Sequence, residues 1–107
     1  MDFTLIWQRI VNLRRGEVIR NWTANNGYLG DAFIVEKPAL NYVEIDTPRA
    51  ETIQHVPKKD FETVYRLWES YISGRTQRQE LREVTRFSKY VISIFRHMET
   101  CGYRLRP

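Results

Sequence analysis

The spacing of hydrophobic residues changes twice along the chain and divides it into three parts. In the first part, apolar residues recur every three or four positions, at Phe3, Ile6, Trp7, Ile10 and Leu13. This spacing places them on one face of a helix. The basic pair Arg14 and Arg15, followed by Gly16, is typical of a helix end. We therefore predict an N-terminal amphipathic helix.

The second part contains four short runs that alternate apolar and polar residues or are rich in β-branched and aromatic residues. They are GEVIRNW, DAFIVEK, NYVEIDT and ETIQHV, and the sequences NNGYLG, PALN and TPRA separate them as turns. In NYVEIDT the alternation from Val43 to Asp46 is typical of a strand with one buried and one solvated face. These runs predict a small antiparallel β-meander of three or four strands.

The third part returns to a helical spacing. Pro57 can occupy the first turn of a helix, and Gly74 supplies its end. Between them lies one continuous apolar stripe, formed by Phe61, Val64, Tyr65, Trp68, Tyr71 and Ile72. A short helix follows, for which Thr76 and Gln79 form a capping-box pair.

The short helix and a longer one complete the chain. In the short helix, Leu81 and Val84 are expected to face the core. Ser88 can cap the long helix, which Gly102 would end. The whole order predicts an α+β fold in a single domain over residues 1–107, with an N-terminal helix, a meander and three C-terminal helices.

The last helix separates its apolar and polar residues onto two sides. At about 100° per residue, one side holds Phe87, Val91, Ile94, Phe95 and Met98. The other side holds Lys89, Ser93, Arg96 and Thr100, with Arg86 and His97 at its margin. No acidic residue lies on this polar side, because Glu99 falls to the flank. Such cations and hydroxyls are the side chains that contact phosphates and base edges.

The charge of the chain is unevenly distributed. The net charge is +4, but residues 75–107 hold 8 Lys and Arg against 3 Asp and Glu, whereas residues 1–74 hold 9 against 10. The entire positive excess therefore lies in the last third. This asymmetry favours an anionic partner.

The runs QRQELREV, TRFS and KYVISIFRHM have the lengths of a first helix, a turn and a second helix. Together they resemble a helix-turn-helix, with Val91 and Ile94 at the apolar anchor positions of the second helix and FETVYRLWESYIS as a supporting helix. The stretch departs from the motif at Leu81, where a small residue is preferred, and at Thr85, where Gly is preferred. We expect DNA binding through these helices, with contacts from Arg86, Lys89, Ser93, Arg96 and His97.

A second resemblance covers about half the chain. VPKKDFETVYRLWESYISG followed by SKYVISIF is similar to small proteins of bacterial mobile DNA, including products of integron gene cassettes. The resemblance rests on the spacing of aromatic residues and transfers no functional residue. It implies a bacterial cytosolic protein, often self-associating. A non-enzymatic interaction or assembly module therefore remains the alternative, in which the same helix side meets an acidic protein surface or water.

No set of residues in the sequence is arranged for catalysis. Glu44 and Asp46 lie on one side of a strand, about 7 Å apart, as on any solvated strand face. Glu36 and Lys37 are adjacent and leave opposite faces, whereas a metal-dependent nuclease needs such groups to converge. His55 has no partner nearby in sequence. The sequence leans against an enzyme.

The remaining composition bears on cofactors, partners and location. Cys101 is the only cysteine, so no internal disulfide can form, and it is expected to be buried. No metal-ligand spacing occurs, and we expect neither a metal nor a cofactor. The chain lacks a membrane-length apolar run and a signal-peptide pattern, which predicts a cytoplasmic protein with no membrane partner. Its many Trp and Tyr residues and its small size favour a homodimer.

Overall fold

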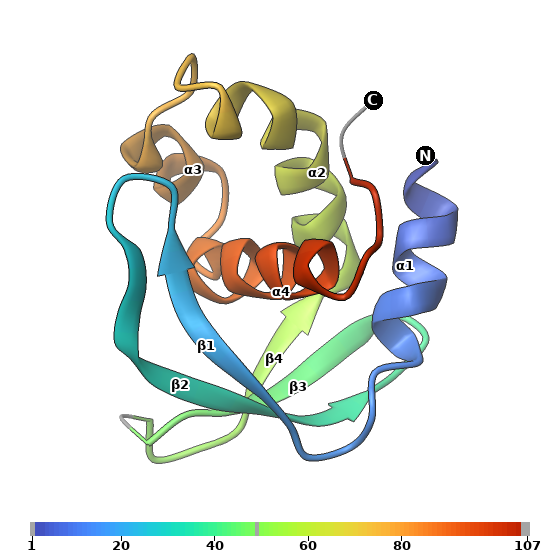
Figure 1. Ribbon diagram of the computed structural model, residues 1–107. Coiled ribbons are helices and arrows are strands. Elements are labelled where there is room, and N and C mark those ends of the chain that lie inside the picture. The colour runs from blue at the N-terminus through green and yellow to red at the C-terminus, as the bar shows by residue number, and fades with distance from the viewer. Residues whose placement is uncertain (1, 49, 106–107) are drawn as a thin grey trace.

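The computed structural model describes residues 2–48 and 50–105 of the chain. Its elements are α1 (Phe3–Val11), β1 (Glu17–Thr23), β2 (Gly27–Pro38), β3 (Tyr42–Asp46), β4 (Gln54–Pro57), α2 (Lys58–Ile72), α3 (Arg78–Val84) and α4 (Ser88–Thr100), as Figure 1 shows. The structure confirms the α+β fold, with an N-terminal helix, a four-stranded antiparallel sheet and three helices.

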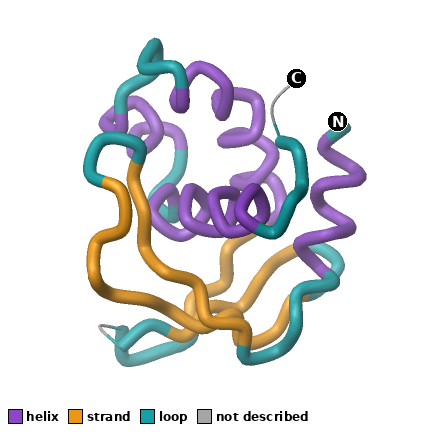
Figure 2. The backbone as a smooth tube through the Cα atoms, in the orientation of Figure 1, coloured by secondary structure: helices purple, strands orange, loops and turns teal. Residues whose placement is uncertain are grey.

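The sheet is a meander in the order β1-β2-β3-β4, and every neighbouring pair is antiparallel. It curves beneath α4, while α2 and α3 lie on the other side of that helix (Figures 1 and 2). The pairing of β1 with β2 is irregular between Arg20 and Trp22, whose partners are Ala32 and Tyr28. Gly30 has a φ of 92° in this irregular stretch, a backbone conformation that glycine adopts without strain. Part of NNGYLG, expected to be a turn, is therefore strand.

The core lies between the concave side of the sheet and the helices. The inward residues of the strands are Ile19, Phe33, Val35, Val43, Ile45 and Val56, all of them buried. Against them packs α4, in which every residue from Val91 to Phe95 is buried. Phe95 also contacts the rings of Phe61 and Trp68 from α2, with centroids 6.0 and 5.3 Å apart. The last helix of the chain is thus the central helix of the fold.

The short helix α3 differs in detail from the prediction. Its capping box is formed by Gln77 and Glu80, one residue later than expected, and the Gln77 N–H donates to Glu80 Oε2 at 2.6 Å. Leu81 is buried as expected, but Val84 is 47% exposed. The chain becomes extended at Thr85, which is buried in place of Val84. Because α3 has only two turns, the residues at which it begins and ends decide which of its side chains face the core.

Two further local predictions were wrong. Ser88 is the first residue of α4 rather than its cap, and its hydroxyl accepts a hydrogen bond from Arg78 Nη1 at 2.7 Å. Cys101 is exposed rather than buried. It follows the last residue of α4, and Gly102, with a φ of 97°, then redirects the chain so that Leu105 is the residue that becomes buried.

Candidate nucleic-acid interface

Ser93, expected at the interface, lies inside the protein. It is 1% exposed, and its Oγ accepts a hydrogen bond from the Trp22 backbone N–H at 3.0 Å and donates one to the Lys89 carbonyl at 3.0 Å. The polar side of α4 therefore covers the free edge of β1. The hydroxyl is occupied by contacts within the protein.

Lys89 and Arg86 lie near the start of α4, at the accessible end of the expected site. Lys89 is half-buried, and its Nζ is 3.8 Å from Asp31 Oδ2 on β2. Arg86 is exposed, and its guanidinium lies 4.7 Å from the centroid of the neighbouring Phe87 ring. Of the expected set, Arg86 is the residue most open to a large anionic partner.

Arg96 and His97 lie near the other end of α4 and meet carboxylates there. Arg96 Nη1 is 3.9 Å from Glu99 Oε1, and its guanidinium covers the Trp22 ring at 5.0 Å. His97 Nε2 is 3.9 Å from Glu17 Oε2. The five expected residues therefore do not form one surface.

The order α3, short connection, α4 follows the helix-turn-helix pattern, but α4 is not free to enter a groove. Ser93 and the neighbouring Ile92 are buried, because β1 packs against the side of α4 that the sequence pattern marks as polar and the Trp22 N–H donates to Ser93 Oγ there. The acids that pair with this side, Asp31 and Glu17, come from strands far away in the sequence. A pattern read along one helix could not locate them.

A different group of cations lies on α3 and its flanks. We call Arg75, Arg78, Arg82 and Arg86 the arginine cluster; successive members are three or four residues apart. Burial lowers the pKa of Arg78, and the positive charge of Arg82 lowers it further. Arg78 and Arg82 are four residues apart on α3 and therefore lie on the same side of that helix.

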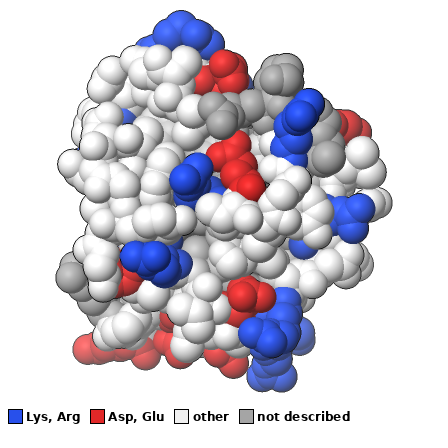
Figure 3. Space-filling view, viewed as in Figure 1, with Lys and Arg blue, Asp and Glu red and all other residues white. Residues whose placement is uncertain are grey.

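The arginine cluster has no carboxylate partner among the described residues. Glu80, the nearest acid on the first turn of α3, accepts from the Gln77 N–H and serves the helix cap. Arg75, Arg82 and Arg86 are exposed. Basic side chains project at the top of the molecule, over the connection between α2 and α3 (Figure 3). Residues 75–86 hold these four arginines against two glutamates, Glu80 and Glu83, so this end of the protein carries a net positive charge of 2.

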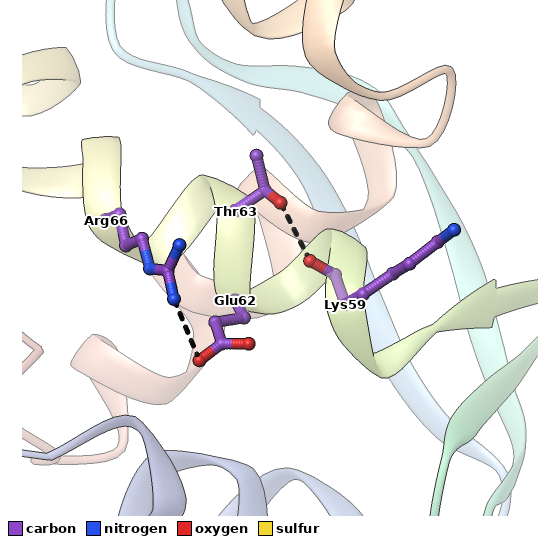
Figure 4. Close-up of polar contacts among 4 residues, drawn as sticks. All are labelled: Lys59, Glu62, Thr63 and Arg66. Carbon is purple, nitrogen blue, oxygen red and sulfur yellow. Dashed lines mark hydrogen bonds and ion pairs between the residues drawn. The ribbon is translucent and has the colours of Figure 1, made fainter.

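The exposed side of α2 shows the contrasting arrangement (Figure 4). Arg66 Nη2 donates to Glu62 Oε2 at 3.4 Å, and Thr63 Oγ1 donates to the Lys59 carbonyl at 2.9 Å. The charge of Arg66 is thus matched within one helix turn. The spacing of the arginine cluster was visible in the sequence, but the lack of acids opposite it was not.

The remaining chemistry of the described residues is limited. No group of three His, Cys, Asp or Glu side chains among them is arranged to hold a metal ion. No helix in the described ranges has both the length and the apolar character that crossing a bilayer requires. Comparison of the chain with protein-family models, with curated proteins and with solved structures finds no match.

Proposed function

We propose that this protein binds duplex DNA through α3 and the connection to α4. The observation that supports this most directly is the arginine cluster, four guanidinium groups within residues 75–86 that have no acidic partner among the described residues. Guanidinium groups bind phosphate oxygens in a bidentate fork and stay charged at all physiological pH values. The positive excess of the last third of the chain acts in the same direction.

The proposed contact is with the phosphate backbone of a duplex rather than with the bases of a single strand. Residues 75–86 contain no aromatic side chain, whereas proteins that bind single strands stack bases on aromatic rings. The side chain of Val84 is exposed between Arg82 and Arg86 and offers no hydrogen bond to a base edge. Backbone contacts of this kind position a protein without reading sequence.

The size of the cluster limits the expected affinity. With 7 residues, α3 is about 10 Å long, so four arginines neutralise about four phosphates at most. Each neutralised phosphate releases counterions, and the affinity of such a contact falls roughly 100-fold between about 50 and 200 mM salt. We therefore expect weak binding that is steeply dependent on salt.

Fluorescence anisotropy with a short random-sequence duplex tests the proposal. The double variant Arg82→Gln/Arg86→Gln should lower the slope of log affinity against log salt by about 2. Its control, Arg14→Gln/Arg66→Gln, removes the same charge from other elements and should leave the slope nearly unchanged. Equal effects of the two variants would show that binding depends on the net charge of the protein and not on the arginine cluster. Absence of binding even at low salt would refute the proposal.

Self-association is a second candidate, supported by the outer side of the sheet. Val18 and Ile34 pair across β1 and β2 and are 56% and 37% exposed. With Ala32 and Pro48 they line an apolar groove of about 320 Å³, in which Asp46 is the charged residue. Light scattering should report a dimer, and Val18→Lys should convert it to a monomer. A monomeric mass for the unaltered protein at millimolar concentration would exclude this candidate.

A further inference from the structure

A charged cleft lies between α2, the end of α4 and the chain segment that follows α4. Its lining consists of Glu69 from α2, Arg96 and Glu99 from α4, and residues 102–105. Its volume is about 560 Å³, which is within the range of sites that hold small molecules. The arginine cluster does not contribute to it. The cleft is therefore a separate site from the proposed DNA contact.

Arg96 is held in one orientation at this cleft. Its guanidinium lies over the Trp22 ring at 5.0 Å, and Nη1 is 3.9 Å from Glu99 Oε1. Its Nε atom is buried and has no hydrogen-bond partner, while 36% of the side chain is exposed. The buried Nε cannot reach a ligand, but a guanidinium that lies against an aromatic ring and is part of a side chain 36% exposed is suited to a planar carboxylate at its exposed edge.

Glu99 secures this arrangement from the protein side. Its Oε2 accepts a hydrogen bond from Trp68 Nε1 at 3.2 Å, and the side chain is only 12% exposed. Because Trp68 is fully buried in the core, the carboxylate is fixed in place. It compensates part of the Arg96 charge and keeps the guanidinium at the cleft.

The sign of the charges around the cleft decides which ligand fits. Arg96 and Arg104 are positive, whereas Glu69 and Glu99 are negative. A simple anion such as phosphate would meet two carboxylates, and a simple cation would meet two guanidinium groups. A ligand with one group of each sign avoids both repulsions. In Figure 3, acidic and basic side chains lie side by side in the middle of the face shown.

We propose that the charged cleft binds a small zwitterion, of the kind presented by a free amino acid or a short peptide. The ligand carboxylate lies against the exposed edge of the Arg96 guanidinium, and its ammonium group lies toward Glu69. Arg104 adds to the positive end of the site. This inference is independent of DNA binding, because it uses none of the residues of the arginine cluster.

The indole N–H signals of the three tryptophans provide a direct readout in ¹H–¹⁵N NMR. Trp22 lies beneath Arg96 and Trp68 donates to Glu99, whereas Trp7 donates to the Leu40 carbonyl elsewhere. Titration of the full chain with diglycine should shift the Trp22 and Trp68 signals saturably and leave that of Trp7 in place. Glycine in a parallel titration distinguishes an amino acid from a peptide as the preferred ligand. No saturable shift with either probe would overturn the proposal.

Two further probes each lack one charge of diglycine. Acetylglycine keeps only the carboxylate, and glycinamide keeps only the ammonium. Each should bind at least about tenfold more weakly, because a charged hydrogen-bonded contact is lost. Acetylglycine binding as tightly as diglycine would overturn the assignment of a zwitterion.

Substitutions then locate the two ends of the ligand. Glu69→Gln alters an exposed side chain and should weaken diglycine binding about fivefold or more while leaving acetylglycine binding no weaker. Arg96→Lys retains the charge, loses the bidentate fork and should weaken both. Glu62→Gln, on the exposed side of α2, is the matched control and should change neither. Unaltered diglycine binding by Glu69→Gln would refute the proposed orientation.

Discussion

The side-chain oxygen of Ser93 accepts a hydrogen bond from the backbone N–H of Trp22 at 3.0 Å. This contact joins the central helix to β1, which is an edge strand of the sheet. Just beyond the end of β1, the Ala24 N–H donates to the hydroxyl of Tyr71 on α2 at 2.9 Å. Unpaired N–H groups on an edge strand attract other strands. Here two helices supply the acceptors, and they close that part of the edge.

Removing the Ser93 hydroxyl should therefore affect stability rather than binding. Ser93→Ala leaves the part-buried Trp22 N–H without its acceptor and should lower the free energy of unfolding by about 0.5–1.5 kcal/mol in urea denaturation. Thr100→Ala, on the exposed part of the same helix, is the control and should cost less. DNA affinity at low salt should stay the same. Weaker DNA binding by Ser93→Ala at unchanged stability would contradict this and show that Ser93 contacts DNA.

Because both sides of α4 are buried, substitutions at two aliphatic residues should differ in how much stability they remove. Ile92 is fully buried although it lies outside the apolar side expected from the sequence, whereas Val84 on α3 is 47% exposed. Ile92→Ala should lower the free energy of unfolding by about 2–5 kcal/mol, because it leaves a cavity. Val84→Ala should change it by about 0.5 kcal/mol or less. Comparable losses from the two substitutions would contradict this arrangement of the helices.

Tyr65 predicts how stability changes at alkaline pH. Desolvation raises its pKa above the ordinary value of 10.0, and the nearby charge of Asp2 raises it further. The folded state therefore holds the phenolic proton more tightly than the unfolded state does. The resulting stabilisation is complete below pH 10.0 and is lost as pH rises through the higher folded pKa. The melting temperature of Tyr65→Phe should fall less steeply with rising alkaline pH than that of the unaltered protein. Parallel curves of melting temperature against pH would contradict this.

Cys101 should react with a thiol reagent in the native protein. Its side chain is exposed just beyond α4, and Sγ lies 3.8 Å from His97 Nε2. A chromogenic disulfide such as DTNB should modify it fully without denaturant, with one equivalent released per chain. The control is the same reaction in urea, which should give the same total. A thiol that reacts only after unfolding would show that the end of α4 is covered.

The order of elements was predictable because it depends on neighbours within a few residues. The period-two alternation around Val43 and Ile45 indicated a strand with one buried face, and the stripe from Phe61 to Ile72 indicated a long amphipathic helix. Both occur as β3 and α2. Helix and strand periodicity follow from backbone geometry alone, so they can be recognised in a single sequence.

The candidate sites were less accessible to this reasoning. On α4 the expected acid-free side is matched by Asp31 and Glu17, which the meander brings to Lys89 and His97. The regular spacing of Arg78 and Arg82 was visible along the chain, but only folding shows that no described carboxylate lies against them. The charged cleft joins Glu69 to Arg96 across two helices, a contact that no local pattern contains.

The sequence by itself determined which segments are helices and strands, their order, and the excess of positive charge in the last third. Only the tertiary structure decided which charged side chains are compensated and which are exposed. The physical reason is one of range: periodicity is set by bonded neighbours, whereas burial and ion pairing are set by residues that meet through space. Ser93 illustrates the difference, since a pattern that marks it as polar is satisfied equally by water and by the Trp22 N–H.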